Sequence, residues 1–345
     1  MLINANTEAN AAVKAIPEIQ GGDWSQLSEQ ILTSTQPIVI RGLVTSWPMV
    51  RSAQTSLQAA DAYLRNFYCG ASVNAMHGSP NIGGRFFYND DLSGFNYSSV
   101  RIRFDAVLDA LREHHLDENP PAFYVGSTTL DNCLPGFRAE NSVDLGNRDP
   151  LVSLWIGNRS RIPAHYDLPD NLACVAAGRR RFTLFPPEQL KNLYVGPLDF
   201  TPAGQAVSMV DFACPDVDKF PKFAIAQEHA QVAELQAGDA LFIPSMWWHH
   251  IEALDSFNVL VNYWWRQSPE YMDTPANTLT HALMTIRDLP PAQRQAWQEI
   301  FRHYVFESDG IEALHIPPAA RRVLAPFDHD TARMLRAHLL NKMKR

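Results

Sequence analysis

The alternation of apolar and polar residues divides the chain into three regions. Residues 1–121 mix short helical and extended patterns. Residues 122–266 contain one short β-rich segment after another, and residues 267–345 return to a helical period. We therefore expect an α/β N-terminal extension, a mainly β central domain and a helical C-terminal region.

The central region has the pattern of an all-β domain. Its segments are short, rich in β-branched and aromatic residues, and separated by Gly, Pro and Asp turns. No helical pattern of 10–15 residues alternates with them, which argues against a parallel βαβ sheet. The pattern favours a sandwich, jelly roll or barrel. The expected strands are 122–125, 151–157, 171–177, 180–185, 231–235, 240–243, 247–254 and 257–265.

The flanking regions predict a few defined elements. In the N-terminal region we expect helices over 25–32 and 103–115 and a buried strand over 37–42. The C-terminal region predicts amphipathic helices, with apolar stripes formed by Leu279, Leu283 and Ile286, by Trp297, Ile300, Phe301 and Tyr304, and by Leu335 and Leu339. Asp330 is placed to cap the last of them.

Composition narrows the functional class. The 345 residues are 46% hydrophobic and 19% charged, with a net charge of −8. This is typical of a soluble globular protein, and the acidic balance argues against nucleic acid as a partner. No apolar run is long enough to cross a membrane, and the N-terminus lacks a secretory pattern, so we expect a cytoplasmic protein. The four cysteines are scattered and predict neither a zinc ribbon nor a disulfide framework.

A candidate metal site begins at Ile162-Pro-Ala-His-Tyr-Asp167. On a strand, His165 and Asp167 point to the same face and can hold one ion. Alternation over 247–254 places His249 on an apolar face with Trp247, and His250 on a more polar face. We therefore take His249 as the third ligand and His250 as a supporting or surface residue. Two histidines and one carboxylate form the ligand set of non-haem Fe(II) oxygenases.

A candidate anion site lies on the predicted strand 180–185. Arg180 shares a face with Phe182 and Leu184, where a cation is costly unless it meets an anion. Guanidinium is suited to bidentate binding of a carboxylate. The polar residues Asn171, Asn262 and Tyr124 lie on neighbouring inward faces and can complete the site.

The chain resembles the cupin-like JmjC-type 2-oxoglutarate oxygenases, in particular the branch of the asparaginyl hydroxylase that inhibits hypoxia-inducible factor. The resemblance covers about residues 30–266. The matching motifs are Pro163-Ala-His-Tyr-Asp167 with Asn171, Leu184-Phe-Pro-Pro187, Gly238-Asp, Ile243-Pro244, Trp247-Trp-His-His-Ile-Glu252, Val261-Asn-Tyr-Trp264 and Gln36-Pro-Ile-Val-Ile-Arg-Gly-Leu-Val-Thr-Ser-Trp-Pro48.

The resemblance implies a double-stranded β-helix core, the jelly-roll or cupin fold, and C-terminal helices that pair two subunits. It makes His165, Asp167 and His249 the iron ligands. It also places Asn171, Tyr124, Asn262 and Trp264 around iron and 2-oxoglutarate. Two positions depart from the family pattern. Arg180 replaces a lysine that holds the distal carboxylate, and Ile162 replaces a threonine that assists it.

The main hypothesis is an Fe(II)- and 2-oxoglutarate-dependent oxygenase that uses O₂ to hydroxylate a C–H bond and releases succinate and CO₂. The substrate would be a protein side chain or a small molecule. The alternatives are a metal-dependent cupin enzyme without 2-oxoglutarate and a non-catalytic peptide-binding cupin module. Residues 83–91 and 200–220 are candidate substrate-facing loops. Of the tryptophans at 247, 248, 264 and 265, we expect Trp247 and Trp264 to line the iron pocket.

Overall fold

Two units make up the chain, Met1–Arg266 and Gln267–Arg345. The computed structural model describes residues 14–22, 26–308, 310 and 312–344. No helix in the described part of the chain is both long and apolar enough to span a membrane.

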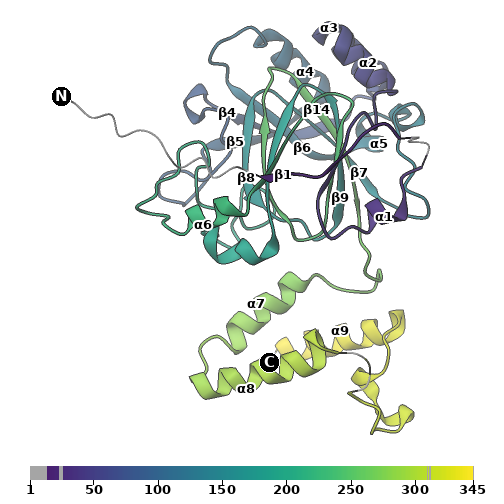
Figure 1. Cartoon of the computed structure of the whole chain (residues 1–345), viewed down its shortest axis with the longest axis vertical. Helices are drawn as coiled ribbons and strands as arrows, with labels where there is room; N and C mark the ends of the chain where they lie inside the picture. Colours follow the sequence, from purple (N-terminus) through teal and green to yellow (C-terminus); the bar gives the residue numbers. More distant parts are fainter. Residues whose placement is uncertain (1–13, 23–25, 309, 311, 345) are drawn as a thin grey trace, which may run out of the picture. The chain divides into compact units, whose positions relative to one another are not determined.

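Two sheets form the first unit (Figure 1). The smaller sheet has the order β1-β11-β10-β13-β8, and the larger has the order β2-β3-β12-β9-β14-β7-β6-β4-β5. The strands of the smaller sheet are β1 (Lys14–Ala15), β11 (Gln231–Leu235), β10 (Arg180–Phe185), β13 (Trp248–Ala253) and β8 (Ser160–His165). Those of the larger are β2 (Glu18–Ile19), β3 (Ile38–Ile40), β12 (Ala240–Ile243), β9 (Asp170–Ala177), β14 (Asn258–Trp265), β7 (Leu151–Gly157), β6 (Ala122–Thr129), β4 (Ser72–Gly78) and β5 (Tyr97–Arg103).

The inner faces of the two sheets share one apolar cluster. Phe182 and Leu184 of the smaller sheet pack with Ala173, Val175 and Leu241 of the larger. This arrangement is the mainly β jelly-roll core that the sequence predicted, and the fold class is confirmed. The candidate site lies between these inner faces.

Helices cover the outer face of the larger sheet. Their buried residues, such as Leu64 and Leu108, pack in one cluster with Leu154, Ile156 and Val261 of the sheet. The helices of this unit are α1 (Glu29–Leu32), α2 (Pro48–Thr55), α3 (Leu57–Phe67), α4 (Phe104–Glu113), α5 (Leu130–Cys133) and α6 (Phe223–Glu228). The sequence predicted α4 and part of α1 but missed α2 and α3; residue 25 of the predicted first helix lies outside the described residues.

Most predicted strands of the central region agree with the structure to within one residue at each end. The exception is β6, which continues four residues beyond 125. One expectation about β8 is wrong. The strand ends at His165, so Asp167 lies two residues past it rather than on a strand with His165.

The second unit contains α7 (Pro275–Thr285), α8 (Pro291–Phe301) and α9 (His329–Met343). The N-cap of α9 is Asp328, whose side chain accepts a hydrogen bond from the Thr331 backbone, rather than Asp330. Asp328 has the extended backbone that an N-cap needs, whereas Asp330 lies in the first turn. None of these three helices contains a buried side chain among the described residues.

Candidate metal centre

Three side chains converge at one end of the smaller sheet. His165 on β8 and His249 on β13 are direct partners in the antiparallel ladder, and their ring centroids lie 4.4 Å apart. Oδ2 of Asp167 lies 3.4 Å from Nε2 of His249. One ligand atom from each residue lies within 4.8 Å of the others, and no other such group occurs among the described residues. The structure therefore brings the three predicted ligands together.

Backbone carbonyls orient both imidazoles. Nδ1 of His165 lies 2.9 Å from the carbonyl of Pro163, and Nδ1 of His249 lies 2.9 Å from the carbonyl of Trp247. A carbonyl only accepts, so each Nδ1 carries the proton and each Nε2 keeps a free lone pair. Both rings are thus held in the tautomer that a metal ion needs.

The charge state of the cluster also suits a metal ion. Burial, together with the nearby His249, lowers the pKa of His165 to about 4. Burial alone would raise the pKa of Asp167, but its contacts with His249 and His165 lower it overall. At neutral pH His165 is neutral and Asp167 is ionised. Two nitrogens and one carboxylate oxygen fit Fe(II) and leave coordination positions open.

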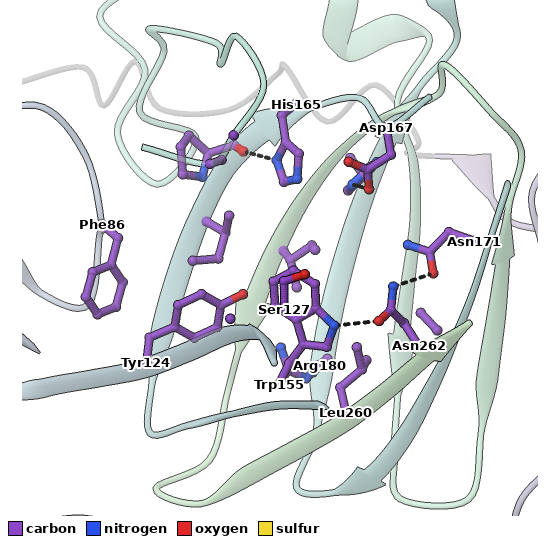
Figure 2. Close-up of a pocket in the computed structure, with 18 of the residues that line it drawn as sticks. Phe86, Tyr124, Ser127, Trp155, His165, Asp167, Asn171, Arg180, Leu260 and Asn262 are labelled. Carbon is purple, nitrogen blue, oxygen red and sulfur yellow. Dashed lines mark hydrogen bonds and ion pairs between the residues drawn. The ribbon is translucent and has the colours of Figure 1, made fainter. Parts of the chain in front are cut away.

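A cavity of about 280 Å³ extends from this cluster between the two sheets. Figure 2 shows His165 and Asp167 at one end of it and Arg180 and Trp155 at the other. Of the charged residue types, the lining contains only the proposed ligands and Arg180. The lining residues are Met76, Phe86, Tyr124, Gly126, Ser127, Trp155, Ile162, Pro163, His165, Asp167, Asn171, Ala173, Arg180, Phe182, Pro202, Ala203, Gly204, His249, Ile251, Leu260, Asn262 and Trp264.

Arg180 is a buried cation at the far end of the cavity. Its side chain is 3% exposed, its Nε has no hydrogen-bond partner, and it forms no ion pair with any described carboxylate. Burial lowers the pKa of Arg180 to about 10, so it remains charged at neutral pH. The hydroxyl of Tyr124, whose pKa burial raises, points into the same cavity (Figure 2). An unpaired buried guanidinium has the charge and geometry to bind an anion.

A chain of hydrogen bonds fixes the two candidate asparagines. Nε1 of Trp155 donates to Oδ1 of Asn262 at 2.7 Å, and Nδ2 of Asn262 donates to Oδ1 of Asn171 at 3.3 Å (Figure 2). The sequence prediction missed Trp155. Alternation on β7 could have found it, because Leu154 and Ile156 belong to the opposite, helix-covered face.

The sequence prediction also missed a bulge in β6 that forms part of the cavity wall. The register between β6 and β7 shifts between Val125 and Thr128, and Ser127 adopts a φ of 48°. A Cβ on Gly126 would lie 3.0 Å from the Trp155 ring and 3.2 Å from the Tyr124 ring. A larger residue would crowd both rings, and a glycine inside a strand pattern is the sequence signal for such a bulge.

Of the two tryptophans predicted to line the pocket, one does and one does not. Trp264 lines the cavity, but Trp247 does not. Trp247 lies in the turn before β13, where alternation no longer holds, and its Nε1 donates to the Thr35 carbonyl at 3.1 Å. His250 points away from the cavity, as predicted, but it is buried against Phe212 rather than on a polar surface.

Both candidate substrate-facing loops reach the cavity. Phe86 comes from the first loop, and residues 202–204 come from the second. The loops also contact each other, because the hydroxyl of Tyr88 donates to the carbonyl of Phe200. Together they form one side of the cavity next to Tyr124.

The sequence profile of the cupin-like domain family matches residues 24–271. Lysine-specific demethylase 8 of Xenopus tropicalis is 26% identical over 255 residues, which cover 73% of this chain and 53% of that protein. Lysine-specific demethylase JMJ31 of Arabidopsis thaliana is 34% identical over 131 residues, which cover 36% of this chain and 23% of that protein. tRNA wybutosine-synthesizing protein 5 of Mus musculus is 32% identical over 160 residues, which cover 42% of this chain and 45% of that protein. The chain spans about half or less of the length of these relatives.

Proposed function

This chain belongs to the cupin-like domain family, and on that premise we propose that it is an Fe(II)- and 2-oxoglutarate-dependent oxygenase that hydroxylates a C–H bond. One observation carries the proposal. A ligand set of two histidines and one carboxylate opens into a cavity whose opposite end holds an unpaired, buried arginine. A dicarboxylic oxo-acid needs these two anchors, a metal for its keto-acid end and a cation for its far carboxylate.

Each residue of the site has a distinct task in this proposal. His165, Asp167 and His249 would hold the iron, and the carbonyls of Pro163 and Trp247 keep the two rings in the binding tautomer. When bound, iron and 2-oxoglutarate supply an oxidant strong enough to break an unactivated C–H bond. Arg180 binds the far carboxylate with Tyr124 beside it.

The walls of the cavity orient and shield the reaction. Asn262 and Asn171 are held by Trp155, so their amide groups are preorganised toward the cosubstrate. Apolar side chains such as Phe86, Leu260 and Ile251 exclude water from the remaining space. Exclusion of water protects a reactive oxidant from side reactions.

Within the family, we propose that the chain belongs to the branch of asparaginyl hydroxylases, because its motifs resemble those of that branch. The substrate is then a side chain of a protein. The names of two relatives indicate lysine demethylation, and a third indicates tRNA modification. Demethylation begins with the same hydroxylation step, while the net charge of −8 disfavours tRNA.

An anaerobic titration tests the proposal. Adding Fe(II) and then 2-oxoglutarate to the purified protein should produce a weak visible charge-transfer band, and admitting O₂ should release succinate. Asp167→Ala should abolish the band. Arg180→Ala should weaken 2-oxoglutarate binding, whereas the matched control Arg181→Ala, an exposed neighbour on the same strand, should not. Absence of the band and of succinate with the unaltered protein would refute the proposal.

One observation favours a second candidate. Ile162 puts a buried apolar side chain into the cavity where the related hydroxylase has a threonine hydroxyl. A metal-dependent cupin enzyme that uses no 2-oxoglutarate would not need the hydrogen bond that this hydroxyl gives the cosubstrate. Turnover by Arg180→Ala without added cosubstrate would favour that enzyme, and unchanged biological activity of Asp167→Ala would instead favour a non-catalytic module.

We also propose that the second unit pairs two copies of the chain. Its helices expose apolar side chains, including Trp297, Ile300 and Leu339, and a groove of about 800 Å³ runs among them. Light scattering should give the mass of a dimer, and Trp297→Glu should give that of a monomer. A monomeric unaltered protein would contradict the pairing.

A further inference from the structure

The three proposed ligands are not held in the same way. His165 and His249 are opposite each other in the β8–β13 ladder, so backbone pairing fixes their separation. Asp167 lies two residues beyond the end of β8 and has no place in that ladder. Some other contact must therefore set the position of its carboxylate.

The turn that precedes β13 contacts the backbone of Asp167 and of the residue after it. The backbone N–H of Met246 donates to the carbonyl of Asp167 at 2.9 Å. Oγ of Ser245 donates to the carbonyl of Leu168 at 2.6 Å, and the backbone N–H of Ser245 donates to Oδ1 of Asp170 at 2.9 Å. These bonds attach the turn to residues 167, 168 and 170 in succession.

The same turn also orients His249. The carbonyl of Trp247 accepts from Nδ1 of His249, and the buried indole of Trp247 donates to Thr35. Met246 has a φ of 69°, which is uncommon for a residue other than glycine and indicates a conformation imposed by the surroundings. Residues 244–247, which we name the ligand turn, thus contact two of the three proposed ligands.

We propose that the ligand turn sets the position of the Asp167 carboxylate and that Ser245 is a positioning residue of the metal centre. Ser245 acts through the Leu168 carbonyl, next to Asp167 in the chain, and itself contacts neither metal nor substrate. Ser245 supplies the only side-chain hydrogen bond that the described residues direct at the Leu168 carbonyl. The inference rests on the proposed function, because it requires a metal ion at His165, Asp167 and His249.

Metal affinity tests the inference without any turnover. The probe is Co(II), whose visible bands report both binding and coordination geometry, titrated anaerobically against a chelator of known affinity. Ser245→Ala should weaken Co(II) binding about tenfold or more, as loss of outer contacts to metal ligands does elsewhere. Ser245→Thr keeps the hydroxyl and should restore most of the affinity.

Ser208→Ala is the matched control. The Ser208 hydroxyl donates to the carbonyl of Leu193 at 2.6 Å, which is the same kind of bond at the same length. Its loss should lower Tm by at least as much as Ser245→Ala, because Ser208 is fully buried and also accepts a hydrogen bond from Val210, and should leave the Co(II) affinity unchanged. This comparison separates a general loss of stability from a loss of positioning.

A double-mutant cycle identifies the route of the effect. In the Asp167→Ala background, Ser245→Ala should have almost no further effect on Co(II) binding, because the positioned group is gone. The inference is overturned if Ser245→Ala leaves the Co(II) affinity unchanged, or if it weakens binding equally in both backgrounds. Failure of the unaltered protein to bind Co(II) would instead refute the proposed metal centre.

Discussion

The buried charge of Arg180 gives the sharpest prediction. The pKa of its guanidinium falls to about 10 because burial penalises the charged form. At about 1.4 kcal/mol per pKa unit, this fall corresponds to roughly 3 kcal/mol by which burial disfavours the charged side chain at neutral pH. No described carboxylate offsets this cost. Arg180→Met keeps an unbranched apolar stem but removes the guanidinium group and its charge.

We therefore expect Arg180→Met to stabilise the protein in the absence of metal and cosubstrate. The gain should be about 1–3 kcal/mol, below the full penalty because the methionine packs imperfectly, or about 2–10 °C in Tm. The proposed function predicts that 2-oxoglutarate raises the Tm of the Fe(II)-loaded protein under anaerobic conditions, and the same variant should lose this increase. At this single position, the variant should gain stability and lose the proposed anion binding.

Thermal unfolding followed by tryptophan fluorescence measures both effects. The control is Arg181→Met, since Arg181 is exposed and paired with Glu234 and Glu252, and its loss should change stability by less than about 0.5 kcal/mol. The reasoning is wrong if Arg180→Met lowers Tm as an ordinary core substitution does. It is equally wrong if the variant still responds to 2-oxoglutarate.

Three further predictions concern the cavity wall and the buried histidines. Trp155→Phe removes the donor that holds Asn262, so 2-oxoglutarate affinity should fall about two- to tenfold in the anaerobic titration, and an unchanged affinity would contradict this role. Gly126→Ala puts a Cβ 3.0 Å from the indole of Trp155 and should lower the free energy of unfolding in urea by about 1–3 kcal/mol. An unchanged free energy of unfolding would mean that the bulge relaxes around the added methyl group. Burial lowers the folded-state pKa of His165 to about 4 and that of His250 to about 3, from 6.5. Because the folded state then binds fewer protons, metal-free stability should be full above pH 6.5 and fall below it, by about 2 kcal/mol per histidine at pH 5, and a flat profile would refute it.

The β core could be predicted from sequence because its strands are buried in a regular way. The segments 151–157, 180–185, 231–235 and 240–243 match the structure residue for residue. The strands β4 and β5 were missed. β5 forms the edge of the larger sheet, is mostly exposed and lacks an apolar stripe, and β4 is the strand next to it, with only part of its residues buried. Edge strands carry little of the pattern that burial imposes.

The limits of prediction at the site have the same physical origin. A period of two placed Arg180 and His249 on inward faces, because both lie on strands. It did not predict that His165 and His249 are neighbours in one sheet, since a period gives the face of a residue but not its partner strand. The period failed for Trp247 because this residue belongs to a turn. The bulge at Ser127 likewise disrupts alternation in β6, and single-residue irregularities of this kind leave only a glycine as their trace.

The ladder partnership of His165 and His249 has a consequence for folding. The two residues face each other across β8 and β13, yet 84 positions separate them along the chain. A divalent ion bound to both closes a long loop, much as a disulfide does, but through a reversible bond. Such a bond disfavours the unfolded ensemble in proportion to the logarithm of metal concentration. The concentration of available iron would then determine how stably β8 and β13 remain paired, as well as the fraction of molecules that carry a metal ion for the reaction.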